Sequence, residues 1–228
     1  MSIAFSTLKT RLQNAVAARS GVPSSDQYDQ ALREAVSDFN ERASRLKVTT
    51  INVVTNTALY ALPSDFVKFV ELQSPLTMAV GNTIVTGQGL VPLPATFDEQ
   101  VTIEGANLRI TPTPSYTMTR DLWYGAGYVE SGSPVVYAEM SEREARIILL
   151  LAKAIAGGYK VDVAANSGIT SVQIGDVRVD KSRVTQDLQA QAEAWQTQYE
   201  TEVDKYVSTI TRRAYDRQPP YARRDLGL

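Results

Sequence analysis

The sequence predicts an α+β protein: an α-helical bundle of about four helices with a β-rich, barrel- or sandwich-like insertion and an extended carboxyl-terminal arm. Three observations predict this class. Apolar side chains recur at helical spacing near both ends of the chain. Seven of the ten prolines lie between Pro63 and Pro134, among runs of β-branched residues. From Thr211 onward, five arginines and two adjacent prolines accompany only two acids. We therefore expect a helical domain over 1–47 and 139–211, a β-rich domain over 48–138, and an arm over 212–228.

Two helices are expected at the amino end. The first covers 3–19 and stops before Gly21. The second covers 25–46, and Ser24 with Gln27 matches the capping box in which each side chain bonds the other residue's backbone. Two helices joined by so short a link are expected to pack as an antiparallel pair. The apolar face of the second helix consists of Tyr28, Leu32, Ala35, Val36, Phe39, Ala43 and Leu46.

The central part of the chain, from Val48 to about Tyr137, has the composition of short strands and loops. Residues 101–104 and 108–111 are two apolar-rich runs separated by a Gly-Ala-Asn turn, which predicts a β-hairpin. Six to eight strands are expected over the whole region.

Two further helices are expected in the second half. One covers 141–165, begins with a capping box at Ser141 and Glu144, and is apolar nearly all round, so it should be buried. The other covers about 180–211 and follows a short extended loop or hairpin over 167–179.

The last helix carries one continuous apolar seam whose members are three or four residues apart. Such a seam requires a long partner helix, from this chain or from a neighbouring subunit. The residues expected to pack in this way are Val184, Leu188, Trp195, Tyr199, Val203 and Tyr206.

The arm is the second candidate interface. Arginine, tyrosine and proline are residue types that suit an extended docking segment, because they bind strongly and lose little chain entropy. A solvated, unstructured terminus is the alternative. The docking residues would be Arg212, Arg213, Tyr215, Arg217, Pro219, Pro220, Tyr221, Arg223 and Arg224.

Composition excludes several kinds of chemistry. The chain has no cysteine and no histidine, which excludes Ser-His-Asp and Cys-His catalysis and the usual zinc sites. The formal net charge of −2 disfavours a whole-surface nucleic-acid binder. No apolar run is long enough to span a membrane, and no signal-peptide pattern stands at the start, so we expect synthesis in a cytoplasm and no membrane partner.

Carboxylates are the remaining candidates for acid–base chemistry. We expect all of them to be solvated surface acids, since nothing in the surrounding sequence indicates burial. The pairs or groups considered are Asp98 with Glu99, Glu142 with Glu144, and Glu193 with Glu200 and Glu202. No cofactor and no metal are expected.

One short motif and the order of elements resemble a known family. The segment 60–72 begins Tyr60-Ala61-Leu62-Pro63-Ser64-Asp65-Phe66 and is similar to a turn and strand that recur in head–tail adaptor (connector) proteins of tailed bacteriophages. The segment 171–180 before the last helix also resembles these adaptors. The motif residues Tyr60, Leu62, Pro63, Asp65 and Phe66 would be structural.

The resemblance implies a structural, non-enzymatic virion protein. Such adaptors form a ring, usually of twelve subunits, beneath the portal at the head–tail junction, and they assemble in the host cytoplasm. The implied partners are further copies of the chain, the portal through the carboxyl-terminal arm, a downstream tail or nozzle protein, and genomic DNA passing through the channel. An acidic body suits such a channel because it repels phosphate.

Three alternatives stay open at this stage. Another neck protein, a stopper or tail terminator, would be smaller and richer in strands. A virion-associated, carboxylate-dependent glycosidase would need two acids facing each other across a cleft. A sugar- or peptide-binding module would use the aromatic residues of 116–137.

Overall fold

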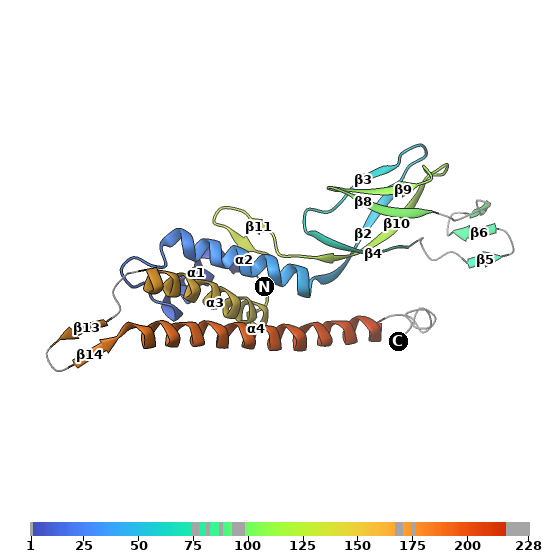
Figure 1. Ribbon diagram of the computed structural model, residues 1–228. Helices are drawn as coiled ribbons and strands as arrows, with labels where there is room; N and C mark the ends of the chain where they lie inside the picture. Colours follow the sequence, from blue (N-terminus) through green and yellow to red (C-terminus); the bar gives the residue numbers. More distant parts are fainter. Residues whose placement is uncertain are drawn as a thin grey trace. The chain divides into compact units, whose positions relative to one another are not determined.

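The computed structural model describes residues 2–73, 78–80, 83–86, 89–92, 99–166, 171–174 and 177–217. The chain divides into two compact units, Met1–Ala43 with Tyr128–Leu228, and Ser44–Gly127 (Figure 1). The second unit begins and ends earlier than the expected range 48–138. Its first strand already starts at Arg45, and the segment 128–138 belongs to the helical unit.

The helical unit has, within the described residues, four helices: α1 (Phe5–Ala15), α2 (Ser25–Ala43), α3 (Glu142–Asn166) and α4 (Lys181–Arg217). Three short strands, β1 (Ile3–Ala4), β11 (Glu130–Ser131) and β12 (Val136–Tyr137), form a small antiparallel sheet in the order β1-β12-β11. A hairpin of β13 (Ser171–Ile174) and β14 (Val177–Asp180) joins α3 to α4. Of the two expectations for this segment, an extended loop or a hairpin, the described residues form the hairpin.

Several helix boundaries differ from the sequence prediction. The helix α1 begins later than 3, because Ile3 and Ala4 pair with β12, and it ends at Ala15 instead of 19. The helix α2 ends at Ala43 instead of 46, because Arg45 already belongs to a strand. The helix α4 continues past 211 to Arg217.

Two capping boxes fix where helices begin. At α2, Ser24 N donates to Gln27 Oε1 at 2.8 Å and Gln27 N donates to Ser24 Oγ at 3.3 Å. At α3, Ser141 N donates to Glu144 Oε2 at 2.6 Å and Glu144 N donates to Ser141 Oγ at 3.3 Å. Both boxes satisfy backbone groups that the first helical turn leaves unpaired, as the sequence predicts.

The core of the helical unit comes from one face of each helix. The predicted face of α2 is buried from Tyr28 to Ala43. The apolar helix α3 lies between the others, with residues such as Ile148 and Ala152 fully buried, which confirms the expected central helix. Within this unit α4 runs as one long helix beside α3 (Figure 1). No helix in the described part of the chain is both long and apolar enough to cross a membrane.

The second unit consists of small antiparallel sheets. One has the order β2-β10-β4, from Arg45–Val53, Met118–Ala126 and Phe66–Gln73. Another has the order β3-β9-β8, from Leu59–Ala61, Asn107–Thr111 and Gln100–Glu104. A third, β5-β6-β7, comes from Met78–Val80, Thr83–Thr86 and Gly89–Pro92. The expected hairpin over 101–111 is the β8–β9 pair, with Gly105 at φ +60 in its turn.

The first two sheets share one apolar core. Its buried residues are Ile51, Val53, Tyr60, Leu72, Leu108, Ile110, Leu122, Tyr124 and Ala126. The α+β class is confirmed, and the sandwich-like form of the insertion agrees with this shared core. The barrel alternative is wrong for the described strands, which form separate sheets that do not close.

Candidate assembly interface

The apolar seam of α4 packs largely against helices of its own chain. Tyr199 and Val203 are buried, and Trp195 and Tyr206 are partly buried against the same core. Leu188 and Val184 are half-exposed at the amino end of the seam. The partner helix that the seam requires is therefore supplied in part by α3 of the same chain. A role of the seam between subunits remains a prediction.

Tyr199 connects α4 to α2. Its hydroxyl donates to Asp38 Oδ2 at 2.5 Å, and the guanidinium of Arg42 lies 5.9 Å from the centre of its ring. Burial and the hydrogen bond to Asp38 raise the pKa of the Tyr199 hydroxyl. The ring stays in the core while its polar end finds a partner, as buried tyrosines require.

Glu144 is a buried acid at the beginning of α3, with 4% of its surface exposed. Ser141 and the hydroxyl of Tyr206 donate hydrogen bonds to its carboxylate. Burial acts to raise the pKa of Glu144, but the hydrogen bonds from Ser141, Tyr206 and Tyr128 outweigh it and hold the pKa below its ordinary value. The expectation that this glutamate is a solvated surface acid is wrong, because the capping box turns it towards the core.

The basic end of α4 is helical where the sequence predicted an extended arm. Arg212, Arg213, Tyr215 and Arg217 lie within α4. The extended conformation expected from 212 onward is wrong up to Arg217, because the first proline, Pro219, comes two residues later. The other candidate docking residues, Pro219, Pro220, Tyr221, Arg223 and Arg224, lie outside the described residues.

The turn motif positions a partly buried carboxylate in the second unit. Pro63 O accepts from Phe66 N at 3.0 Å, which closes the turn around Asp65. Asp65 Oδ2 pairs with Lys47 Nζ, and Oδ1 accepts from the hydroxyl of Tyr124, both at 2.9 Å. Burial opposes ionisation, yet these two hydrogen bonds leave the pKa of Asp65 below its ordinary value. The carboxylate thus links the turn to β2 and β10.

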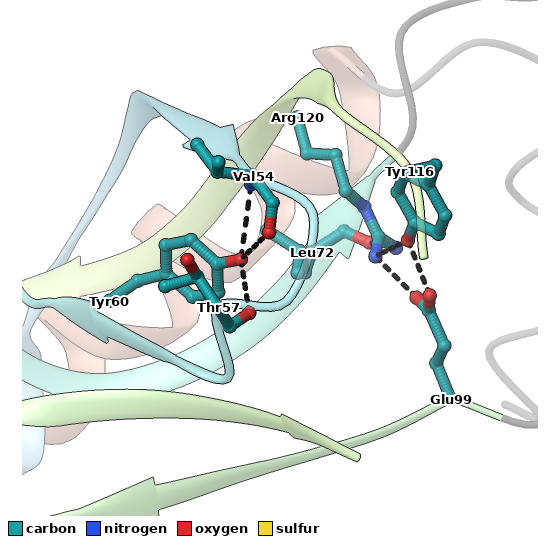
Figure 2. Close-up of polar contacts among 7 residues, drawn as sticks. All are labelled: Val54, Thr57, Tyr60, Leu72, Glu99, Tyr116 and Arg120. Carbon is teal, nitrogen blue, oxygen red and sulfur yellow. Dashed lines mark hydrogen bonds and ion pairs between the residues drawn. The ribbon is translucent and has the colours of Figure 1, made fainter. Parts of the chain in front are cut away.

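Three other motif residues are also structural. The hydroxyl of Tyr60 donates to Thr57 O at 2.6 Å and accepts from Val54 N at 3.2 Å, which fixes the β2–β3 loop (Figure 2). The ring of Phe66 stacks on Tyr124 with 6.0 Å between ring centres. Leu62 N donates to Ala106 O at 3.0 Å. The motif contributes no free reactive group.

A buried ion pair that sequence reasoning missed lies in the same unit. Arg120, 7% exposed, donates to Glu99 Oε2 at 2.6 Å and to Leu72 O at 3.0 Å. Glu99 also accepts from the hydroxyl of Tyr116 (Figure 2). Burial, with the hydrogen bond to Glu99, raises the pKa of Tyr116 to about 12. Glu99 is thus not the solvated acid expected from the sequence, and its neighbour Asp98 lies outside the described residues.

With this geometry in place, the chain can be compared with known proteins. The model of the SU10 adaptor protein family matches residues 3–165, which covers the second unit and the helical unit up to α3. The chain belongs to the SU10 adaptor protein family. This confirms the resemblance to bacteriophage head–tail adaptors.

A chain in a solved structure is also similar to this adaptor. It comes from the neck of an empty GTA particle computed with C6 symmetry, is 13% identical, and has a TM-score of 0.26 over 86% of this chain and 94% of that chain. No curated protein matches.

The described residues of this adaptor contain no group of three or more acidic side chains that could hold a metal ion. A surface groove of about 490 Å³ lies between α3 and α4 in the helical unit. The α3 side of this groove carries the charged residues Glu142, Arg143, Arg146 and Lys153 together with apolar residues such as Ile147 and Leu150, and Gln198 with Glu202 lines the α4 side. An open groove of mixed polar and apolar residues suits contact with another macromolecule better than enclosure of a small substrate.

Proposed function

We propose that this chain is the subunit of a structural ring that joins the portal to the tail of a bacteriophage virion. The observation that carries the proposal is the family match over residues 3–165, which includes parts of both compact units. In such a ring each subunit contacts one neighbour through one face and the other neighbour through a second, different face. Repetition of this head-to-tail contact closes the ring. The resemblance implies twelve subunits and a channel through which genomic DNA passes.

The carboxyl end of α4 is the proposed docking segment for the portal. Arg212, Arg213 and Arg217 lie on the last turns of a helix, where positive charge is favoured by the helix dipole. Guanidinium groups there can bind carboxylates of a partner in a two-bond geometry. The residues from Pro219 onward would extend this contact.

The second unit is the proposed contact for the tail or nozzle protein. Large apolar side chains that are grouped on a surface mark an interaction face. The surface of this unit exposes several such side chains. The exposed residues of this unit are Leu46, Val48, Val54, Leu59, Val70 and Ile103.

We propose no catalytic role. A general acid in a glycosidase needs a raised pKa, whereas the pKa of the buried Glu144 is lowered. The other buried acid, Glu99, is already bound by Arg120 and Tyr116. Nothing in the described residues favours the stopper, glycosidase or sugar-binding alternatives over an adaptor.

The test mixes the purified full-length chain with cognate portal rings. Negative-stain images should show an added ring on one face of the portal, and native mass spectrometry of the complex gives the subunit number. A chain ending at Ile210 should fold but lose attachment. A chain ending at Arg217 retains three of the five arginines, so intermediate attachment would divide the docking energy between the end of α4 and the residues that follow it. Normal attachment of the shorter chain contradicts the docking role, and absence of any ring contradicts the adaptor proposal.

A further inference from the structure

One face of α3 carries three basic residues without an ion-pair partner in the described part of the chain. Arg146, Lys153 and Lys160 are spaced seven residues apart, so they recur every two turns on one side of the helix, about 10.5 Å apart. Arg146 acts electrostatically on Glu142, but both carboxylate oxygens of Glu142 already accept hydrogen bonds from Arg11. We call Arg146, Lys153 and Lys160 the basic strip.

At Lys160, no acid is among the groups that shift the pKa. Burial and the nearby positive charge of Arg19 both lower the pKa of the Lys160 ammonium group. A nearby acid would act in the opposite direction. No acid of the described residues therefore offsets the charge of Lys160, while Arg146 and Lys153 border the groove that Glu202 also lines.

A matching acidic set lies on α4. Glu193, Glu200 and Asp204 are exposed, and none of them forms an ion pair within the described residues. Glu193 and Glu200 are seven residues apart, about 10.5 Å along the helix, which is the spacing of the basic strip. Within the described residues, Glu193 accepts a hydrogen bond from Gln189 and Glu200 accepts one from Gln196, both on α4. We call Glu193, Glu200 and Asp204 the acidic strip.

The two strips do not face each other within one subunit. The residues of α4 that border the groove beside α3 are Gln198 and Glu202. At 100° per residue, the members of the acidic strip lie roughly 120–160° around α4 from Gln198. One subunit therefore presents the basic strip on α3 and the acidic strip on a different flank of its helical unit, as a head-to-tail contact requires.

The heights of the strips along the helices also correspond. The helices α3 and α4 run antiparallel, since Tyr206 bonds Glu144 while Trp195 and Ala192 lie beside Gly157. This register places Lys153 within one turn of the height of Glu200. It likewise places Lys160 near the height of Glu193, and Arg146 near that of Asp204. A ring axis that runs along these helices would keep these heights equal in every subunit, so the correspondence would then also hold between neighbours.

We propose that the basic strip of one subunit pairs with the acidic strip of the next copy of this chain in the ring. This inference rests on the proposed function, because it names the contact that closes the ring. Three ion pairs at one interface fix the register of neighbouring helices and select copies of this chain over other partners.

The test uses the full-length chain with portal rings and exchanges charges across the interface. Lys153→Glu alone places two acids opposite each other, and Glu200→Lys alone places two bases opposite each other. Each single variant should raise the concentration needed for half-maximal ring formation by about tenfold or more. Asp187→Lys is the matched control, because Asp187 is an exposed acid of α4 outside the acidic strip, and it should assemble as the original chain does.

Mixing the two single variants gives the decisive observation. In an alternating ring, one interface joins the two substituted positions, an acid at 153 against a base at 200. The next interface joins the original Lys153 of one variant to the original Glu200 of the other. Every contact then pairs opposite charges, so an equimolar mixture should recover ring formation, and recovery also shows that both variants are folded. Ring formation by the original chain should weaken with added sodium chloride, because salt screens exposed charges.

A cross-linking experiment supplies an independent measurement. The chain has no cysteine, so Lys153→Cys with Glu200→Cys introduces the only two thiols. A short bifunctional maleimide should convert assembled rings into a ladder of covalent multimers, while Lys153→Cys with Asp187→Cys should stay largely monomeric.

Two outcomes would overturn the pairing while leaving the adaptor proposal intact. One is normal ring formation by both single variants. The other is normal rings of Lys153→Glu with weakened binding of duplex DNA, which would make the basic strip a phosphate contact. Failure of the original chain to form any ring with the portal is distinguishable from both, and it would end the proposed function together with this inference.

Discussion

The hydroxyl of Tyr206 donates a hydrogen bond to Oε1 of Glu144, so a side chain from the last third of α4 closes the amino end of α3. Glu144 uses its other oxygen to cap that helix through Ser141 N. The guanidinium of Arg143 lies 5.4 Å from the centre of the Tyr206 ring. One buried carboxylate thus holds both the start of α3 and its register against α4.

Removing the Tyr206 hydroxyl should weaken the helical unit. Tyr206→Phe retains the ring but takes a donor from a buried carboxylate, so the free energy of unfolding should fall by about 1–3 kcal/mol. Urea denaturation measures the change. Tyr159→Phe is the matched control, since Tyr159 packs on the same core without a hydroxyl hydrogen bond among the described residues. An equal effect of the two substitutions would contradict a special role for the Tyr206–Glu144 bond.

Stability should fall at acid pH. The pKa of folded Glu144 lies below its ordinary value of 4.5, so the unfolded chain binds the proton more readily. The stability that Glu144 contributes is fully present above the unfolded value and is lost as the pH falls towards the folded one. Asp65 acts in the same direction in the second unit, from an ordinary value of 3.8. Urea midpoints measured between pH 7 and pH 3 should decline below about pH 4.5, and Glu144→Gln should show lower stability at pH 7 with a shallower decline.

The helices and their caps follow from the sequence because local rules determine them. Hydrophobic spacing identified the faces of α2, α3 and α4, and both capping boxes form as the residues Ser24 and Ser141 predict. The end of α4 was misjudged, because proline stops a helix only near itself and says little about the residues before Arg217.

The buried charges did not follow from the sequence, because their burial depends on tertiary contacts. A signal was available for Arg120. In β10 the residues at 118, 120, 122 and 124 share the inward face, so a basic residue in phase with Leu122 and Tyr124 must be buried and paired. Its acidic partner Glu99 precedes β8, and no local pattern connects the two.

The Arg120–Glu99 pair should be costly to break from one side. Arg120→Met leaves an uncompensated buried carboxylate, and Glu99→Gln leaves a buried guanidinium, so each should lower the free energy of unfolding by about 3–5 kcal/mol. The double variant should lose less than the sum of the two, because it leaves no unpaired charge behind. Chemical denaturation of all four chains completes the cycle. Simple additivity would show that the two side chains stabilise the unit independently.

Two adjacent glycines in α3 should respond in opposite directions. A Cβ at Gly157 would lie 3.4 Å from Ala192 Cβ and from the ring of Trp195, so α4 packs closely at this point. Gly157→Leu should therefore force the two helices apart and lower the free energy of unfolding by about 1–3 kcal/mol. Gly158 has nothing within 4 Å of an added Cβ, so Gly158→Ala should stabilise the chain by about 0.5–1 kcal/mol through helix propensity alone. Thermal denaturation of the two variants separates the effects. A gain for Gly157→Leu would contradict the close approach of α4 at Gly157, and a loss for Gly158→Ala would contradict the open space at Gly158.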